Sequence, residues 1–126
     1  EGVAPHEEAS PGMEADGADR FARQLREAMR DRLHEADFGV SELAAAVAME
    51  RTGLYRRMSE ELGVTPSDFM RTVRIEAACG LLQQGHTVAE AAYAVGYGSV
   101  SSFSRRFRDE VGETPGHFAA RHRNAS

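Results

Sequence analysis

The stretch VAEAAYAVGYGSVSSFSRRFRDEVGETPGHF, residues 88–118, repeats an earlier stretch of the same chain. The earlier copy is VSELAAAVAMERTGLYRRMSEELGVTPSDF, residues 40–69, and the offset between the copies is 48 residues up to Val95 and 49 afterwards. Each copy predicts a short helix, a tight turn and a second helix, an arrangement that can place the second helix in a DNA major groove. Two copies of one unit indicate that the chain performs one task twice.

Capping residues mark where the helices begin. Thr87 and Glu90 form the two ends of a capping box, and Glu42 lies where its carboxylate complements the matching helix of the first copy. Thr65-Pro66 and Thr114-Pro115 each predict another helix, because threonine caps a helix and proline suits its first position. Each copy therefore continues directly into a further helix.

The turn inside each copy requires a residue that tolerates a positive φ angle. Gly96 meets this requirement in the second copy, four residues after the small Ala92. The equivalent residue of the first copy is Ala48, which weakens the turn signal there. We therefore expect a somewhat different turn geometry in the first copy.

Apolar periodicity predicts an all-α fold of seven helices, with two helix-turn-helix subdomains joined by a long connecting helix. The connecting helix, from about Pro66 to Gln84, is apolar on two sides. Its length of roughly 27 Å suits a bridge that holds the two units about one DNA turn apart. The expected segments are a disordered acidic linker over 1–18, a leading helix over 19–36, the first helix-turn-helix over 37–65, the connecting helix over 66–85, the second helix-turn-helix over 86–112, and a terminal helix and tail over 113–126.

The net charge of −5 is unevenly distributed along the 126 residues. Residues 1–19 hold six acidic residues and no basic one, so residues 20–126 carry fifteen basic residues against fourteen acidic ones. All fifteen basic residues are arginine, whose planar fork suits phosphate and guanine, and several lie in the second helix of each copy. The local charge therefore permits nucleic-acid binding although the sum does not indicate it.

The composition gives little support to other classes of protein. No stretch is long and apolar enough to span a membrane and no signal peptide is evident, so we expect a cytoplasmic protein. The single Cys79 lies in an apolar helical pattern and is expected to be buried. Scattered histidines, among which only His117 and His122 have a metal-like spacing, and the lack of any lysine argue against a metal, a cofactor or an enzyme.

The second copy resembles the DNA-binding domain of the AraC/XylS family of bacterial transcription regulators. The residues that carry the resemblance are Gly96 to Phe107, Gly112 to Pro115, Phe118, and in the first copy Leu54 to Arg57, Gly63 to Pro66 and Phe69. The segment from Ala36 to Ala44, with Phe21 and Leu25, resembles the subset found at the C-terminus of response regulators and hybrid sensor kinases. The resemblance implies double-stranded DNA as the partner, with RNA polymerase or an upstream sensor or dimerisation domain as further partners.

The resemblance also implies base contacts from the second helix of each copy. Leu54 and Met58 face inward in the first copy, as Phe103 and Phe107 do in the second. The outward positions, where we expect base contacts, are Thr52, Tyr55, Arg56, Val100, Ser101, Ser102 and Arg105. The flanking positions, where we expect phosphate contacts, are Arg57, Ser99, Ser104 and Arg106.

Individual side chains suggest how such an interface reads DNA. Arg56 and Arg105 can each bind guanine O6 and N7, whereas Val100 can only touch apolar groups such as the thymine methyl. Glu50 is an anion at the start of the first recognition helix, so the first unit is expected to be the weaker reader. For Arg71 and Arg74 we favour a structural task, either pairing with Glu76 or capping neighbouring structure.

Sequence-specific DNA binding in transcription regulation is the leading hypothesis. A helical protein-interaction module of the same fold is the alternative, favoured by the near-zero charge of the domain and by Glu50. A DNA-repair alkyl acceptor is a third class, but it requires an exposed and reactive cysteine.

Overall fold

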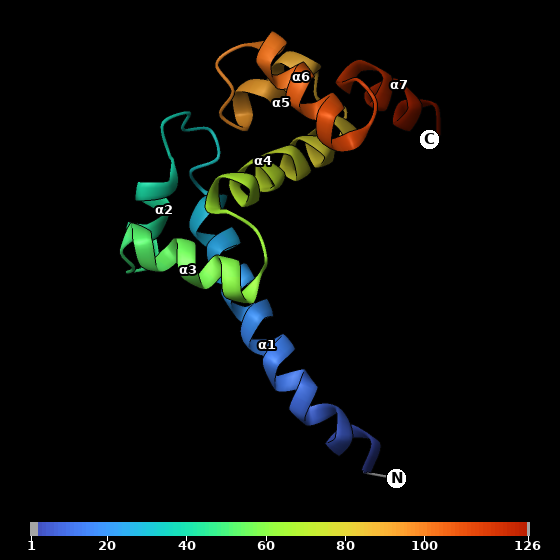
Figure 1. The fold of residues 1–126 in the computed structure, drawn as a ribbon. Helices are drawn as coiled ribbons and strands as arrows, with labels where there is room; N and C mark the ends of the chain where they lie inside the picture. The colour runs from blue at the N-terminus through green and yellow to red at the C-terminus, as the bar shows by residue number, and fades with distance from the viewer. Residues whose placement is uncertain (1–2, 126) are drawn as a thin grey trace.

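The computed structural model describes the backbone of residues 3–125 and the side chains of residues 17–123. This part of the chain forms seven helices and no strand, as the sequence predicts (Figure 1). The helices are α1 (Val3–Arg30), α2 (Val40–Ala46), α3 (Arg51–Glu61), α4 (Pro66–Gln83), α5 (Val88–Ala94), α6 (Val100–Val111) and α7 (Pro115–Ala125). No helix within the described residues is long and apolar enough to cross a lipid bilayer.

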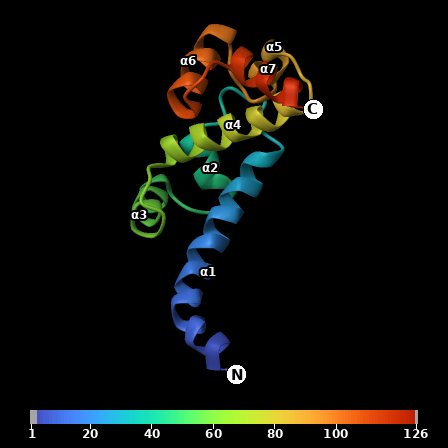
Figure 2. The same ribbon diagram turned by 90° about the vertical axis from the view of Figure 1, so that its right-hand side faces the viewer.

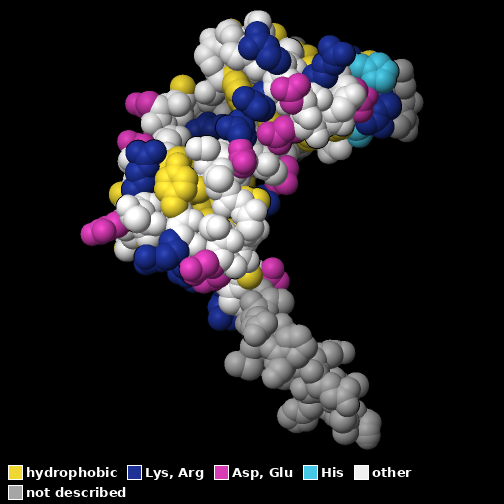
Figure 3. Space-filling model, viewed as in Figure 1, with side chains coloured by type: hydrophobic (Ala, Val, Ile, Leu, Met, Phe, Trp, Pro, Cys, Tyr) yellow, Lys and Arg dark blue, Asp and Glu magenta, His cyan; other side chains and the backbone are white. Residues whose placement is uncertain are grey.

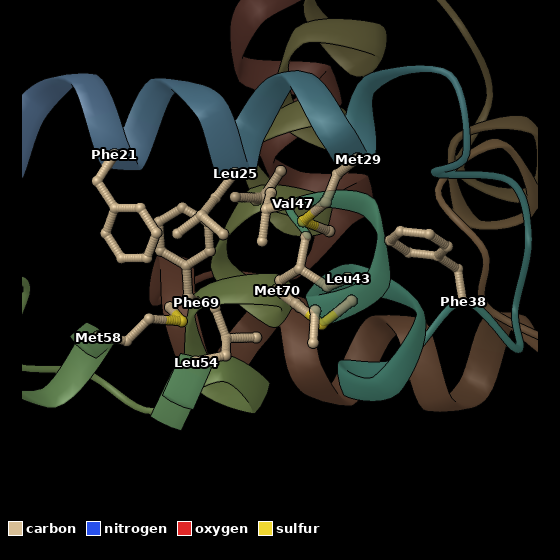
Figure 4. Packing of buried hydrophobic residues seen from close by; sticks show 12 residues of the cluster. Phe21, Leu25, Met29, Phe38, Leu43, Val47, Leu54, Met58, Phe69 and Met70 are labelled. Carbon is tan, nitrogen blue, oxygen red and sulfur yellow. The ribbon is translucent and has the colours of Figure 1, made fainter. Parts of the chain in front are cut away.

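The long helix α4 lies between two separate hydrophobic cores. Its first half contributes Phe69, Met70 and Val73 to a core shared with α1, α2 and α3 (Figure 4). Its second half contributes Ile75 and Leu82, among others, to a core shared with α5, α6 and α7. The change of side falls at Arg74. A single helix thus belongs to both helix-turn-helix units, as expected of a connecting helix.

Helix α1 differs at both ends from the leading helix expected over 19–36. It begins at Val3, so residues 3–18 are helical where we expect a disordered linker; glutamate and alanine, frequent in this stretch, both favour helix. It ends at Arg30 rather than near Glu35, and the chain continues in tight turns in which the amides of Arg32 and Glu35 donate to the carbonyls three residues earlier.

The first unit holds α1 firmly. Phe21, Leu25 and Met29 are at most 1% exposed and face α2, α3 and α4 across the core (Figure 4). Arg26 forms an ion pair with Glu76 of α4 at 2.5 Å. The part of α1 that follows residue 20 is therefore an integral element of the domain.

The turns inside the two units are alike, contrary to the different geometry expected at Ala48. The Met49 amide donates to the Ala44 carbonyl at 2.9 Å, and the equivalent Tyr97 amide donates to the Ala92 carbonyl at 3.0 Å. Ala48 adopts φ +59° where Gly96 adopts +89°. The hydrogen-bonded turn and the packing on both sides hold the alanine in a left-handed conformation that alone is unfavourable.

The predicted caps are present. Thr87 Oγ1 accepts from the Glu90 amide at 3.1 Å, while a carboxylate oxygen of Glu90 accepts from the Thr87 amide at 2.9 Å. In α2 the carboxylate of Glu42 accepts from the Gly39 amide at 2.9 Å, and this hydrogen bond is the main reason why the pKa of Glu42 is lowered. At the start of α4, Thr65 Oγ1 accepts from the Asp68 amide, as Thr87 does in α5. Local sequence signals therefore fix where these helices begin.

Candidate nucleic-acid interface

The second helices of the two units, α3 and α6, lie on the same side of the molecule. Figure 2 shows both at the left edge, with α6 above α4 and α3 below it, and Figure 1 shows them on opposite flanks of α4. The inner face of α3 is anchored by Leu54 and Met58, and that of α6 by Phe103 and Phe107, all 0% exposed. Because these residues occupy the core, the opposite face of each helix is left to solvent.

The expected base contacts of the first unit lie on that open face. Thr52, Tyr55 and Arg56 are all exposed, and together they line one shallow hollow with the loop that follows α3. The side chain of Arg56 forms no ion pair with any other described residue. Arg56 is thus available to a ligand, and beside it lies the exposed Tyr55 ring, over which the Arg51 guanidinium lies 5.7 Å from the ring centre.

The expected base contacts of the second unit are less uniform. Ser101, Ser102 and Arg105 are exposed, but Val100 is partly buried against the second core. Ser102 is also partly engaged, since its amide and its hydroxyl both lie 3.1 Å from the hydroxyl oxygen of Ser99. Ser101 and Arg105 are therefore the most accessible groups of this face, and only part of Val100 remains open to a thymine methyl.

The two arginines expected to bind phosphate differ sharply in their surroundings. Arg57 pairs with Glu61 at 2.9 Å, and its guanidinium lies 3.9 Å from the centre of the buried Phe21 ring of α1. Arg106, its equivalent in the second unit, forms no ion pair among the described residues and lies beside Arg105 and Tyr97 in a shared hollow. Arg57 anchors α1 to α3, whereas Arg106 is available to an anion.

The remaining expected phosphate contacts are serines at α6. Ser99 is exposed and caps the helix by accepting from the Ser102 amide, while Ser104 is half-buried beside Arg105 and Arg108. Arginine side chains occur over both units on the face that carries α3 and α6, with acidic side chains among them (Figure 3). Glu50 is exposed at the N-cap of α3 and makes no capping hydrogen bond. The charge of this face is therefore patterned rather than uniformly basic.

Arg71 and Arg74 both have partners within the protein, but neither pairs with Glu76, the carboxylate suggested by the sequence. Glu76 pairs with Arg26, and Arg71 pairs with Asp68 on its own helix. Arg74 is buried and donates to backbone carbonyl oxygens. Capping of neighbouring structure is the alternative that holds for Arg74.

The described residues contain no group of histidine, cysteine and carboxylate side chains that could hold a metal ion. Cys79, expected to be buried, is half-buried. Burial, with Glu76 and Glu113 nearby, raises the pKa of its thiol. Because the thiolate is the reactive form, Cys79 is a poor acceptor for an alkyl group.

Known proteins share both the sequence and the fold. A helix-turn-helix domain family matches residues 43–121. The transcriptional activator NphR of Rhodococcus is 32% identical over 100 residues, which are 79% of this chain and 30% of that protein. An AraC-type transcriptional regulator from Chromobacterium violaceum has a similar structure, with a TM-score of 0.75 and 25% identity over 85% of this chain and 96% of the other.

The DNA-binding domain of AdpA, solved in complex with a target DNA, has a TM-score of 0.70 and 30% identity over 81% of this chain and 95% of that domain. The chain thus spans nearly all of these two solved structures but less than a third of NphR. The family match covers more than half of the chain, including both recognition helices. The chain therefore belongs to the AraC-type family of helix-turn-helix transcription regulators.

Proposed function

We propose that the chain binds double-stranded DNA sequence-specifically to regulate transcription, with α3 and α6 in adjacent major-groove segments on one face of the duplex. The observation that carries this proposal is the pair of equivalent helices on one side of the molecule, each with its core face buried and an arginine exposed on the other. The relative AdpA was solved with DNA, which supports the same partner for this chain.

Arg105 and Arg106 of α6 make different kinds of DNA contact, one to a base and one to a phosphate. Arg105 lies on the exposed face and reads guanine, with discrimination of about 1 to 3 kcal/mol for a good bidentate pair. Arg106, half-buried at the flank, binds phosphate and adds affinity without sequence information. In the first unit Arg56 corresponds to Arg105, while Arg57 is held by Phe21 and Glu61. The second unit is therefore expected to contribute more to DNA affinity than the first.

A mobility-shift assay on a pool of genomic fragments at 50 and 200 mM salt tests the function. If about four arginines neutralise phosphates, the affinity falls about 100-fold between the two salt concentrations. Specific complexes that weaken this steeply support the proposal. Absence of any complex at low salt refutes it and favours the helical protein-interaction module, which the near-zero charge of residues 20–126 permits.

Two arginine variants test the division of work. Arg105→Ala lowers the base preference at the position that Arg105 contacts by about 1 to 3 kcal/mol, while Arg106→Ala weakens all sites alike and lowers the salt slope by about one. Circular dichroism checks that both variants retain the helicity of the wild type. A uniform loss of affinity in both variants contradicts the assignment.

We further propose that the chain acts as the output domain of a cytoplasmic regulator, under the control of an upstream sensor or dimerisation domain. The resemblance to output domains of two-component proteins and the greater length of NphR support this organisation. RNA polymerase is the partner expected at a promoter. Recovery of RNA polymerase with the chain only on DNA that carries both a binding site and a promoter tests that contact.

A further inference from the structure

Arg74 lies where the two units meet. It is 8% exposed, and it occupies the point of α4 at which the helix passes from one core to the other. Its Nη1 donates to the Val95 carbonyl at 2.7 Å and also to that of Leu33. Its Nη2 donates to the carbonyls of Phe38 at 3.0 Å and Glu35 at 3.2 Å. One side chain thus holds four carbonyl oxygens.

These carbonyls come from both units. Leu33, Glu35 and Phe38 belong to the loop that leads from α1 into α2 of the first unit. Val95 ends α5, and its neighbour Gly96 forms the turn that leads to α6 of the second unit. The arginine therefore joins the segment that precedes the first helix-turn-helix to the turn inside the second.

Hydrogen bonds of the Arg74 guanidinium would be lost without replacement if one unit rotated relative to the other. Burial lowers the pKa of Arg74, and the neutral carbonyl dipoles are what stabilise the guanidinium inside the protein. Hydrogen bonds to a charged group are stronger than neutral ones, and a buried charge that loses its partners is costly. Rotation of one unit about α4 would move either the Val95 carbonyl or the carbonyls of the loop 33–38 away from the guanidinium. The charge therefore opposes such rotation.

The glycine of the second turn shows how closely the two units approach here. A Cβ atom at Gly96 would overlap Arg74 Nη1 and the Leu33 carbonyl oxygen, and would lie 3.1 Å from Arg74 Cζ. No such contact exists at Gly63, Gly85 or Gly112, which also have positive φ angles. Gly96 thus has a second task besides the turn, since it leaves room for Arg74 and for the loop of the other unit.

We propose that Arg74 is a positioning residue that fixes α3 and α6 relative to each other and thereby makes the spacing between two DNA half-sites a determinant of affinity. This inference rests on the proposed function. Two rigidly joined readers gain affinity from simultaneous binding only when the half-sites match their separation. Two recognition helices that are loosely joined tolerate a one-base-pair change in spacing, but binding of one helix then raises the affinity of the other by less.

The test uses Arg74→Lys and Arg74→Gln, with Arg71→Gln as the matched control. Arg71 lies on the same helix, but it pairs only with Asp68 of α4 and joins no other element. The probes are a two-part duplex enriched by the wild-type chain from random DNA, the same duplex with one base pair inserted between its halves, and a duplex that keeps only the half bound by α6.

For the wild type and Arg71→Gln, the insertion lowers affinity by about tenfold or more, since one half-site is lost. The Arg74 variants keep their half-site affinity within about twofold and lose most of the advantage of the full site, so the insertion costs them less than about threefold. A wild-type spacing ratio in Arg74→Lys and Arg74→Gln overturns the proposal. An equal loss on half and full sites also overturns it, because such a loss reflects only a smaller folded fraction.

Residual dipolar couplings of the free protein give a readout without DNA. The wild type fits one alignment tensor for both units, whereas Arg74→Gln requires two; if Arg74→Gln does not fold, Arg74→Lys takes its place. A single shared tensor in the Arg74 variant refutes the proposal whatever the DNA result. If the wild type binds no DNA but the tensors separate as expected, the proposed function fails while the mechanical coupling by Arg74 stands.

Discussion

Gly96→Ala should destabilise the domain far more than a glycine-to-alanine change at another residue with positive φ. Gly96 has φ +89°, so an alanine there adopts a left-handed conformation at a cost of about 1 to 2 kcal/mol. The added methyl would also overlap the Arg74 guanidinium and the Leu33 carbonyl oxygen. Relief of that overlap shifts backbone or disrupts charged hydrogen bonds, which adds about 1 to 3 kcal/mol. We expect a total loss of about 2 to 5 kcal/mol in the free energy of unfolding.

Gly112→Ala is the matched control. Gly112 has φ +94°, but a Cβ atom there would meet nothing within 4 Å. The control therefore reports the backbone cost alone, about 1 to 2 kcal/mol. Urea unfolding followed by circular dichroism measures both variants. If the two losses agree within about 0.5 kcal/mol, the close approach of the two units at Arg74 is refuted.

Three further changes have defined outcomes. Ala48→Gly should stabilise the domain by about 0.5 to 1 kcal/mol in urea unfolding, since relief of the left-handed strain exceeds the entropy cost of glycine; a loss of stability would contradict the strain. Thr87→Ala should cost about 1 kcal/mol in the same assay because the Glu90 amide loses its cap, and an unchanged midpoint would show that the cap contributes nothing. The pKa of Glu113 is lowered from 4.5 to about 2, chiefly by hydrogen bonds from Arg121 and His117, so its contribution to stability is present above pH 4.5 and is lost as the pH falls toward 2. Glu113→Gln should flatten that part of a plot of melting temperature against pH, and an unaltered slope would assign the acid sensitivity elsewhere.

Local signals were sufficient to predict most of the fold. The starts of α4 and α5 follow from Thr65 and Thr87, whose side chains satisfy amides of their own helices. The duplication then transfers the same assignment from one unit to the other, including the burial of Leu54 and Phe103. Such features depend on residues three or four positions apart, which a sequence displays directly.

Features that depend on distant residues were not predictable in the same way. Arg57 looks like a phosphate contact in the sequence, but its guanidinium packs on Phe21 of α1. The loop after α1 is held by Arg74, 41 residues beyond Leu33, whose carbonyl accepts from its guanidinium. The sequence favoured a structural task for Arg74, either pairing with Glu76 or capping neighbouring structure, and the second alternative holds. The sequence does not identify which carbonyls Arg74 binds, because they lie 21 to 41 residues away along the chain.

If one molecule places two recognition helices on one face of a single duplex, hydroxyl-radical footprinting on a duplex selected from random DNA will show both of them. We expect two protected windows on each strand, separated by about 10 to 10.5 base pairs, one helical turn. A single protected window of one half-site at saturating protein would contradict it.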